Sequence, residues 1–375
     1  MRPKPLVSII VPVFNCETFL QDCLASLAAQ TYSPIEIVAV NDGSTDNSAC
    51  ILDEFAARDA RFRVLHTTNK GVQSAWMAGV RASSGEFIGF VDADDWVHAA
   101  MFEILVDAAI ETNARVVNCS LVRANDRSAQ VDGDPRSWNE TGWFRVDGRE
   151  AARELLVGVA RGRSRILPSR CLKLFNRQLL VSNLEFCDGS VVMGDDVNIA
   201  VPCLLDVDFL VCLEAELYFY RQNPSSLTNK YLAGFATSNA ALLGSLRRAI
   251  HAKGVDLGSA ELEYFGWLTL RALVNECRGP GGLWERGRRV TKIYNQQDAR
   301  LGLRRLRRAG IDRSSQLVRL SCRVGMPFLS PFVVLATDWA RRWFRVVSEV
   351  RPIVFPRVAR EGVLGPLHPS DGSPG

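Results

Sequence analysis

The chain has 375 residues, of which 47% are hydrophobic and 23% charged, so it can bury more than one layer of core and lacks the composition of a disordered or fibrous protein. Its ten cysteines include no Cys-x-x-Cys pair and its four histidines are not at ligand spacings, which argues against a zinc site or disulfide framework and favours a cytoplasmic protein with reduced thiols. The net charge of +4 hides an asymmetry: residues 231–375 contain 23 Lys and Arg against 11 Asp and Glu, which leaves 22 against 30 in residues 1–230.

The chain opens with an apolar run at residues 6–14 that superficially resembles a signal peptide. The run is short, Pro12 interrupts it, and no small-residue cleavage site follows, so we interpret it as a buried first strand. No uninterrupted apolar stretch approaches the roughly 20 residues that a membrane-spanning helix needs.

Over the first 120 residues, apolar segments of strand length alternate with segments of helical periodicity. We expect strands at residues 6–11, 35–40, 63–66, 87–91 and 116–120, and helices at 19–27, after a cap at Ser44 or Asp46, after Gly71, and over 98–112. This alternation predicts an α/β fold with a mostly parallel sheet covered by helices on both faces.

Polar residues follow three of these strands where each strand ends. They are Asn15 and Glu17, then Asn41 to Ser44, then Asp92 to Asp95. Because ligands of such sheets gather beyond the carboxyl ends of the strands, we expect the three turns to meet at one binding edge.

Asp92, Asp94 and Asp95 come directly after an apolar strand. Buried carboxylates must be paired or bound to a cation, and oxygen ligands alone favour Mg2+ or Mn2+ over zinc or copper. Such a cation neutralises a diphosphate leaving group. The alternative is that Asp94 or Asp95 caps the helix containing Met101, but three adjacent carboxylates exceed what a cap requires.

The turn from Asn41 to Asp46 has two interpretations. Gly43 permits a tight turn, and the Asp42 carboxylate can accept hydrogen bonds from the N–H groups of a base edge. An ordinary strand-to-helix turn with Ser44 as the cap explains the same residues.

Four segments, in this order and spacing, resemble the signature series of glycosyltransferase family 2. They are Val7 to Asn15, Asn41 to Asp46, Asn69-Lys70-Gly71, and Gly85 to Asp95. The resemblance implies a GT-A fold that binds a nucleotide-diphosphate sugar and transfers the sugar with inversion at the anomeric carbon. By position it implies a donor site in which the nucleoside, usually uridine, is held by Pro12, Val13, Asn15, Glu17 and Asp42. Asp92 and Asp94 are implied as contacts of the ribose, diphosphate and metal, with Asp94 as the metal ligand. Lys70 and Ala93 are further donor-nucleotide contacts.

A second block is similar to the acceptor half of capsule and cell-wall polysaccharide members of the family. It comprises Lys173 to Arg177, Val192 to Val197 and Leu217 to Thr228, so the resemblance covers about residues 5–230. Lys173 and Arg221 are candidate diphosphate or acceptor contacts, because fixed positive charge stabilises a departing nucleotide. Either could instead be a surface ion-pair partner.

The acceptor half must supply a base, because a sugar hydroxyl is far too weak an acid to ionise before it attacks. Asp195 and Asp196 follow Gly194 and precede an apolar helix, which presents carboxylates at a helix N-terminus. The family pattern here is Glu-Asp, whose second residue matches Asp196. We assign Asp196 as the base and Asp195 as a candidate acceptor ligand; helix capping by both is the alternative.

One segment departs from the family pattern. Ala75-Trp76-Met77 stands where members commonly have Ala-Arg-Asn. This change predicts a different donor, or stacking of Trp76 in place of the guanidinium, or a weakened or inactive enzyme.

The domain organisation follows from these patterns. We expect a transferase domain at residues 1–230, with a donor half at 1–120, an acceptor half at 165–230, and between them an irregular excursion with a turn at Asp132 to Pro135. A basic helical extension is expected at 231–350 and a flexible tail at 351–375.

Arginines mixed with aromatic and aliphatic residues after residue 300 suggest an interfacial helix on anionic lipid. A packed helical subdomain with a solvated basic rim is the alternative, and no motif supports nucleic acid as a partner.

The leading hypothesis is an inverting transferase that uses Mg2+ or Mn2+ to add a sugar from a UDP-sugar to a glycan or lipid-linked acceptor in cell-surface polysaccharide synthesis. We expect it to be cytoplasmic, with peripheral association at the inner face of the plasma membrane. Two other hypotheses fit the same patterns: a sugar nucleotidyltransferase, and a non-catalytic nucleotide-binding module that docks at a membrane.

Overall fold

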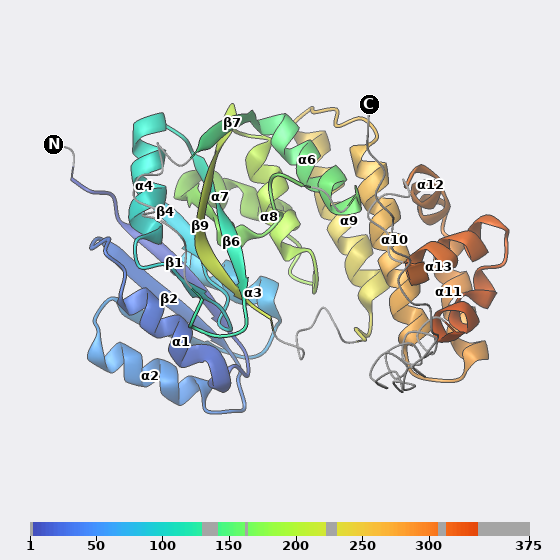
Figure 1. Cartoon of the computed structure of the whole chain (residues 1–375), viewed down its shortest axis with the longest axis horizontal. Coiled ribbons are helices and arrows are strands. Elements are labelled where there is room, and N and C mark those ends of the chain that lie inside the picture. The colour runs from blue at the N-terminus through green and yellow to red at the C-terminus, as the bar shows by residue number, and fades with distance from the viewer. Residues whose placement is uncertain (1–2, 130–141, 162–163, 223–230, 307–312, 337–375) are drawn as a thin grey trace, which may run out of the picture.

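The computed structural model describes residues 3–129, 142–161, 164–222, 231–306 and 313–336 (Figure 1). Within them, nine strands form one sheet in the order β3-β2-β1-β4-β8-β6-β9-β5, with β7 also paired to β9. The strands are β1 (Val7–Val13), β2 (Ile35–Asp42), β3 (Phe62–Thr67), β4 (Phe87–Phe90), β5 (Trp96–Val97), β6 (Val116–Ala124), β7 (Trp143–Asp147), β8 (Lys173–Asn176) and β9 (Phe209–Arg221).

Helices alternate with the strands in the first part of the chain and dominate its end. The earlier helices are α1 (Glu17–Ala28), α2 (Ser48–Arg58), α3 (Val72–Ala82), α4 (Met101–Thr112), α6 (Gly148–Arg161), α7 (Arg177–Asn183) and α8 (Asp195–Leu204). The later ones are α9 (Phe235–Ala252), α10 (Ala260–Arg278), α11 (Leu283–Tyr294), α12 (Gln297–Arg305) and α13 (Arg313–Arg323). Short 3-10 turns are η1 (Arg170–Leu172), η2 (Leu184–Phe186) and η4 (Pro327–Leu329).

The α/β class predicted from the sequence is confirmed, but the sheet is mixed and only its first half is all parallel. β1 pairs in parallel with β2 and β4, and β2 with β3. In the second half β8 runs antiparallel to both β4 and β6, and β5 and β7 run antiparallel to β9. An apolar run predicts that a strand is buried, whereas its direction depends on the path by which the chain re-enters the sheet.

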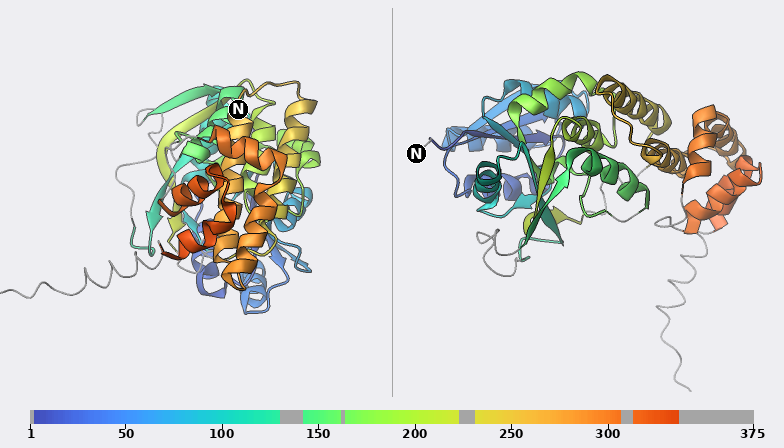
Figure 2. Two further views of the ribbon diagram at one scale, coloured as in Figure 1. Left: turned by 90° about the vertical axis from the view of Figure 1, so that its right-hand side faces the viewer. Right: turned by 90° about the horizontal axis from the view of Figure 1, so that it is seen from above.

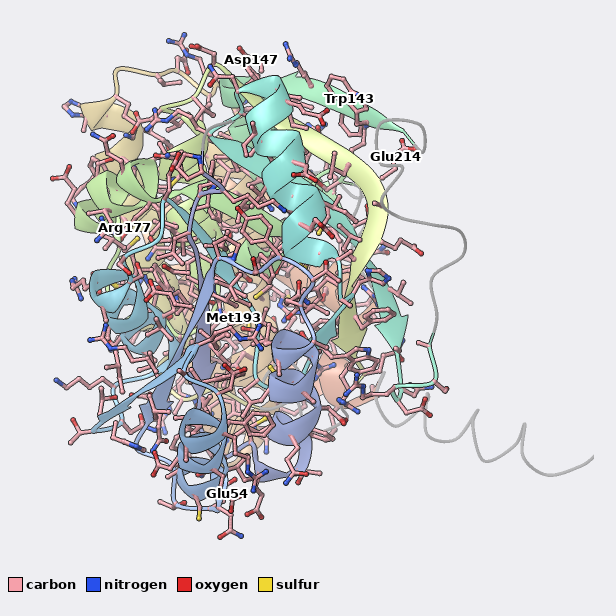
Figure 3. All side chains as sticks on the ribbon, turned by 90° about the vertical axis from the view of Figure 1, so that its left-hand side faces the viewer. Glu54, Trp143, Asp147, Arg177, Met193 and Glu214 are labelled. Atoms are coloured by element: carbon pink, nitrogen blue, oxygen red, sulfur yellow. The ribbon has the colours of Figure 1, made fainter. Side chains whose placement is uncertain are left out.

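The segment expected to be irregular between the two halves is partly regular. β6 extends to Ala124, and β7 and α6 follow after the undescribed residues 130–141, which include the predicted turn at Asp132 to Pro135. Figure 3 shows Trp143 and Asp147 on β7 and Glu214 on β9, the strand with which β7 pairs. The sequence carried a signal for α6, because its buried residues recur at helical spacing. They include Ala151, Ala152, Leu155 and Leu156.

The first strands are buried because both faces of the sheet are covered. All seven residues of β1 are buried, and a side chain at Gly79 of α3 would meet Ile10 at 2.5 Å, so α3 lies directly against this strand. β1 pairs with β2 through a register that places Val13 beside Asn41. The loops that leave these two strands therefore begin at neighbouring positions.

The helices after residue 231, which are coloured yellow to red in Figure 2, contribute residues to two hydrophobic cores. Leu242 and Leu246 of α9, and Tyr264 and Leu268 of α10, are part of the main core under the sheet. The second half of α10 joins α11 to α13 in a smaller core that includes Leu273, Val290, Leu303 and Val318. α10 thus connects the sheet to the terminal helices. Across the described ranges, no helix has both the length and the apolar character required to cross a bilayer.

Candidate active site

Hydrogen bonds brace the loops after β1 and β2 against each other. Asn15 Oδ1 accepts from the Thr45 amide (2.8 Å), and Glu17 Oε2 accepts from the Asn47 amide (2.9 Å). In return, Ser44 Oγ and Asp46 Oδ2 accept from the amides of residues 15 and 17. Asn15 and Glu17, predicted as nucleoside contacts, are exposed at this edge, but part of their hydrogen-bonding capacity fixes the two loops. Ser44 is therefore not the side-chain cap of α2.

Asp42 ends β2 and fixes a third loop. Its buried carboxylate accepts from the amides of Lys70 (2.9 Å) and Gly71 (2.8 Å), and the Lys70 side chain is exposed. Gly43 is required beside it, because its φ is +70° and a Cβ there would lie 2.8 Å from the Asn69 nitrogen. The predicted convergence of these loops occurs at the carboxyl ends of β1 and β2, with Pro12 and Val13 buried in β1 beneath them.

The three carboxylates after β4 have three different environments, and none caps α4, which begins at Met101 without a side-chain cap. Asp95 is buried and accepts from Tyr218 Oη (2.7 Å) and from the Arg221 amide (2.7 Å). Burial raises the pKa of Asp95 well above its ordinary value. Asp95 thus anchors the turn to β9, with the Tyr218 hydroxyl also accepting from the Asp92 amide (3.2 Å).

The Asp94 carboxylate is half-buried, and we find no hydrogen bond to it from another residue of the described chain. Burial, reinforced by the charge of Asp92, raises the pKa of Asp94 to about 6. Ala93, between them, is buried. Asp94 is therefore the acid of this turn that remains available to a cation.

Arg221 lies beneath the turn rather than at the surface of the site. Its Nε donates to the Asp94 carbonyl (2.8 Å) and its Nη2 to Asp22 Oδ2 (2.8 Å). The guanidinium carbon lies 4.8 Å from the Phe19 ring centroid and 4.6 Å from that of Trp96. With these partners Arg221 supports the turn, and the expected direct contact with diphosphate or acceptor finds no support in its position.

A divalent cation fits this site only if it shares ligands with the substrate. Within the described ranges, no group of three or more His, Cys, Asp or Glu residues could hold a metal ion by itself. Asp94 offers one unpaired carboxylate, and Asp92 is bonded to an arginine. Because Mg2+ commonly keeps one or two carboxylates plus phosphate oxygens and water, this donor set suits a diphosphate-bound cation.

Arg170, which the sequence interpretation missed, bonds carboxylates of both the turn after β4 and the first turn of α8. It lies in η1, its side chain is 3% exposed, and its Nη2 donates to Asp92 Oδ1 at 2.7 Å. Its Nη1 donates to Asp195 Oδ2 (2.6 Å) and Asp196 Oδ1 (2.8 Å). The segment from Ile166 to Phe175 is mostly apolar and contains two charged residues, Arg170 and Lys173. This was the available signal, since a buried charge needs partners.

Asp195 and Asp196 occupy the first turn of α8, whose N-cap is Gly194, and neither makes a side-chain cap. Asp195 is 11% exposed at its side chain, and burial raises its pKa to about 7. Asp196 is 31% exposed. Its Oδ1 also accepts from the Arg170 amide (2.9 Å), whereas we find no hydrogen bond to its Oδ2 in the described chain. Asp196 therefore has one oxygen fixed and one available.

Lys173 is in the core, not at the surface where an acceptor would bind. Its Nζ donates to the carbonyls of Leu167 (2.7 Å) and Ser169 (2.9 Å), the residues that precede Arg170. Burial lowers the pKa of Lys173 to about 8. The position of Lys173 supports a structural role in holding η1, and it argues against the expected contact with an acceptor.

Trp76 is fully buried in α3 and meets Phe90 edge-on, with ring centroids 5.8 Å apart. The hypothesis that Trp76 stacks on the donor is therefore wrong, because its ring is inside the core. Gln73 and Met77 of the same helix are also buried. The apolar residues at this position fill the space between α3 and the sheet.

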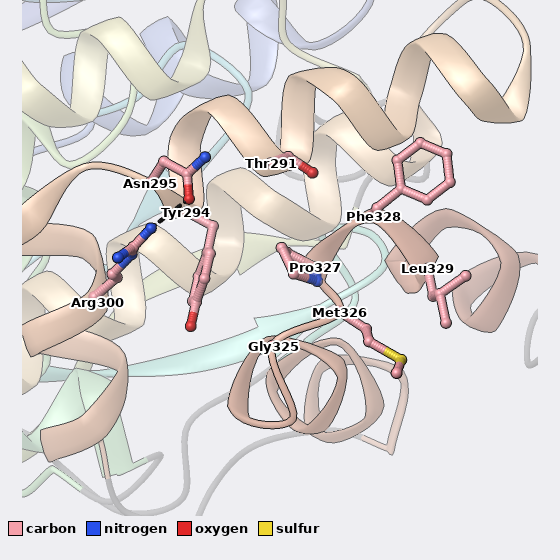
Figure 4. Close-up of a pocket in the computed structure, with 9 residues that line it drawn as sticks. All are labelled: Thr291, Tyr294, Asn295, Arg300, Gly325, Met326, Pro327, Phe328 and Leu329. Carbon is pink, nitrogen blue, oxygen red and sulfur yellow. Dashed lines mark hydrogen bonds between the residues drawn. The ribbon is translucent and has the colours of Figure 1, made fainter.

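A separate cavity of about 620 Å3 lies among the C-terminal helices (Figure 4). It is lined by Thr291, Tyr294, Asn295, Arg300, Gly325, Met326, Pro327, Phe328 and Leu329. None of these residues is acidic, so the cavity supplies neither a metal ligand nor a carboxylate base. The chemistry-bearing carboxylates are at the sheet edge and the start of α8.

The sequence matches the model of the family described as Glycosyl transferase family 2 over residues 8–164. The chain is 37% identical over 226 residues to the Uncharacterized glycosyltransferase EpsJ of Bacillus subtilis (strain 168), a match that covers 60% of this chain and 63% of EpsJ. It is 30% identical over 240 residues to the Putative glycosyltransferase EpsH of the same organism, with 64% and 67% covered. The match thus spans just under two thirds of the length of EpsJ.

Among solved structures, the fold is similar to S. aureus TarS 1–349 in complex with UDP, with a TM-score of 0.58 and 18% identity over 89% of this chain and 92% of that one. The TarS 1–349 complex with UDP-GlcNAc gives a TM-score of 0.59 and 16% identity over the same shares. At such identities the likeness establishes the fold alone.

Proposed function

The chain belongs to glycosyltransferase family 2, and from that premise we propose that it is an inverting, metal-dependent transferase that uses a nucleotide-diphosphate sugar, most simply a UDP-sugar. The observation that carries the proposal is the pair of available carboxylates, Asp94 and Asp196, on two segments that Arg170 links through its bonds to Asp92 and Asp196. Two complexes of one protein of similar fold, TarS 1–349, with UDP and with UDP-GlcNAc, support the choice of donor.

The donor site is proposed at the edge formed by the loops after β1, β2 and β4. Pro12, Val13, Asn15, Glu17 and Asp42 shape the nucleoside end. The side chains of Asn15, Glu17 and Asp42 accept from backbone amides of the neighbouring loops, which holds these loops together. Lys70, Asp92, Ala93 and Asp94 would lie toward the ribose and diphosphate. A bound Mg2+ or Mn2+ would neutralise charge on the leaving diphosphate, and Asp94 is the residue to hold it.

The acceptor side supplies the base. As the acceptor oxygen forms its bond to the anomeric carbon, the bond from that carbon to the diphosphate oxygen breaks and the nucleoside diphosphate leaves. The acceptor proton passes to Asp196 Oδ2. Asp196 suits this role better than Asp195, because the Asp195 side chain is 11% exposed and the Asp196 side chain is 31% exposed.

The test is transfer or hydrolysis of a panel of nucleotide sugars with Mn2+ or Mg2+. We expect Asp94→Ala and Asp196→Asn each to abolish turnover while the variants keep the wild-type melting temperature. Turnover at the wild-type rate in both would reject the assignment, and pyrophosphate release from a nucleoside triphosphate would indicate a nucleotidyltransferase instead.

We further propose that the acceptor is a glycan or lipid-linked molecule and that the C-terminal helices bring the enzyme to a membrane surface. The described residues 283–306 and 313–336 contain ten Arg and Lys against two acidic residues. Exposed apolar residues accompany them: Leu320, Val324, Met326, Leu329, Phe332 and Leu335. Exposed apolar groups with arginines favour the interface of an anionic bilayer.

Flotation with vesicles tests this association. We expect binding to vesicles that contain phosphatidylglycerol, weaker binding to pure phosphatidylcholine, and loss of binding in a Leu320→Asp, Val324→Asp double variant. A Leu167→Asp variant, which alters an exposed apolar residue outside these helices, is the control. Equal flotation of all three proteins would contradict the proposed surface.

A further inference from the structure

Arg170 is surrounded by more acidic groups than it can neutralise. One guanidinium faces the carboxylates of Asp92, Asp195 and Asp196, all within 2.6 to 2.8 Å of its terminal nitrogens. These carboxylates come from two elements, the turn after β4 and the first turn of α8. The cluster therefore connects the proposed donor site to the proposed base.

The geometry of the guanidinium makes this connection rigid. Nη2 is bonded to Asp92, while Nη1 is bonded to Asp196, and the planar group fixes the separation of these two nitrogens. The Arg170 amide donates to the same Asp196 oxygen, Oδ1, that accepts from Nη1. Two donors on one oxygen fix the carboxylate plane and leave Oδ2 as the oxygen that can take a proton.

The backbone of Arg170 is itself held in place. Ser169 Oγ accepts from the Cys171 amide at the start of η1, and Lys173 Nζ donates to the carbonyls of Leu167 and Ser169. Phe90 lies under the guanidinium at 5.8 Å from the ring centroid. Arg170 is thus supported by a shell of contacts that limits its rotation.

We propose that Arg170 is a positioning residue that orients Asp196 for proton transfer and ties it to the donor-binding turn through Asp92. The inference rests on the proposed function and deepens it. Arg170 does not reach the diphosphate in this role, since both its terminal nitrogens are bonded to carboxylates and its Nε is buried. Arg170 contributes by fixing the distance between Asp92 and the proposed base, Asp196.

A role limited to stability is a weaker explanation. A buried ion pair contributes little net stability, because desolvation of the charges offsets their attraction. Among the described residues, the Nε atom of Arg170 also has no hydrogen-bond partner, which an arrangement built for stability alone would not favour. Precise placement of a base, by contrast, has a large effect on rate.

The experiment compares Arg170→Lys, Arg170→Ala and wild type in the sugar-transfer assay, with UDP affinity measured separately by calorimetry. Arg170→Lys keeps the charge but loses the planar fork, so we expect kcat to fall about 100-fold, as for a misplacement of about 1 Å. UDP affinity should change little, because in the proposed role the terminal nitrogens of Arg170 bond carboxylates and not the diphosphate. In Arg170→Ala, added guanidinium chloride at low millimolar concentration should restore part of kcat.

Arg177→Lys is the matched control (Arg177 is labelled in Figure 3). The one hydrogen bond that we observe for its side chain within the described chain runs from Nε to the Ser83 carbonyl. This variant should retain wild-type kcat and show no response to guanidinium. Melting temperatures identify any variant that fails to fold. If Arg170→Ala fails to fold, Arg170→Lys decides the outcome.

The results separate the two proposals. Suppose that the wild type transfers a sugar. If Arg170→Lys then has an unchanged kcat, or loses activity only because it binds UDP more weakly, the positioning role is overturned and the proposed function stands. Intact UDP binding by wild type without transfer of any sugar in the panel overturns the proposed function, and the role of Arg170 with it.

Discussion

Asp92, at the end of a central strand, and Asp196, in the first turn of α8, accept hydrogen bonds from the two terminal nitrogens of one arginine, at 2.7 and 2.8 Å. The two residues are 104 positions apart in the sequence. Their separation in space is therefore set by the planar guanidinium of Arg170. This group joins the turn after β4 to the helix that carries the proposed base.

Asp94→Asn should remove metal-dependent binding of UDP. The carboxylate has no other partner that we observe in the described chain, so its replacement costs the fold little and removes the proposed cation ligand. We expect the stimulation of UDP affinity by Mn2+, measured by calorimetry, to be lost while metal-free affinity remains. Asp22→Asn, which alters a partner of Arg221 outside the turn, should keep the stimulation. Full stimulation in Asp94→Asn would contradict the assignment.

Lys173→Met should change how stability depends on pH. Burial lowers the pKa of Lys173 from 10.5 to about 8, so between these values the unfolded chain binds a proton that the folded chain has released. This group therefore increases the free energy of unfolding as pH rises from about 8 to 10.5, by at most about 3 kcal/mol. Urea titrations at several pH values give the free energy of unfolding of wild type minus that of Lys173→Met, and the contributions of other titrating groups cancel in this difference. If the difference does not increase in favour of the wild type between about pH 8 and 10.5, the prediction is contradicted.

Gly194→Ala should destabilise the fold and lower turnover. Gly194 has φ +88°, and a Cβ there would lie 2.6 Å from Leu242 Cδ2 of α9. We expect a loss of about 2 to 4 kcal/mol from backbone strain plus overpacking. Gly254→Ala is the matched control, because Gly254 also has a positive φ, +61°, but has nothing within 4 Å of the added Cβ. It should lose only about 1 kcal/mol, and equal losses measured by urea unfolding would exclude the packing effect.

Removal of the chain after residue 230 should prevent folding of the transferase half. Leu242, Leu246, Tyr264 and Leu268 belong to the same core as the sheet, so the truncated chain would expose apolar surface that they cover. We expect an insoluble or partly unfolded product by circular dichroism. A chain ending at residue 336, which keeps both described cores, should melt cooperatively. Cooperative melting of the 1–230 chain would show that residue 231 is a true domain boundary.

Trp76→Phe should affect stability and not donor choice. Trp76 is fully buried against Phe90, so the smaller ring leaves a cavity, and we expect a loss of about 1 to 3 kcal/mol. The KM values for a panel of nucleotide sugars should keep their order. A changed donor preference in this variant, with little change in melting temperature, would contradict the core role.

Part of the site was predictable from the sequence because it depends on local patterns. Asn15, Asp42 and Asp92 each follow an apolar strand directly, and the carboxyl ends of neighbouring parallel strands meet at one edge. Asp196 was found in the same way, from its place at the start of an apolar helix. Chain order and spacing were sufficient for the α/β class, for the three loops and for family membership.

The partners of the charged residues depended on the tertiary structure. Asp94 and Asp95 are adjacent and chemically identical, yet Asp95 is bonded to β9 while Asp94 is left available. Lys173 resembled a ligand contact and is buried instead, because β8 enters the centre of the sheet. Arg170 could not be paired with Asp92 from spacing, since 78 residues separate them. The sequence by itself determined which segments are strands and helices and where the acids lie along them, because periodicity and turn chemistry are local. Only the tertiary structure decided which acid is available to a cation, which is an anchor and which faces Arg170, because pairing and burial of charge depend on contacts between distant segments.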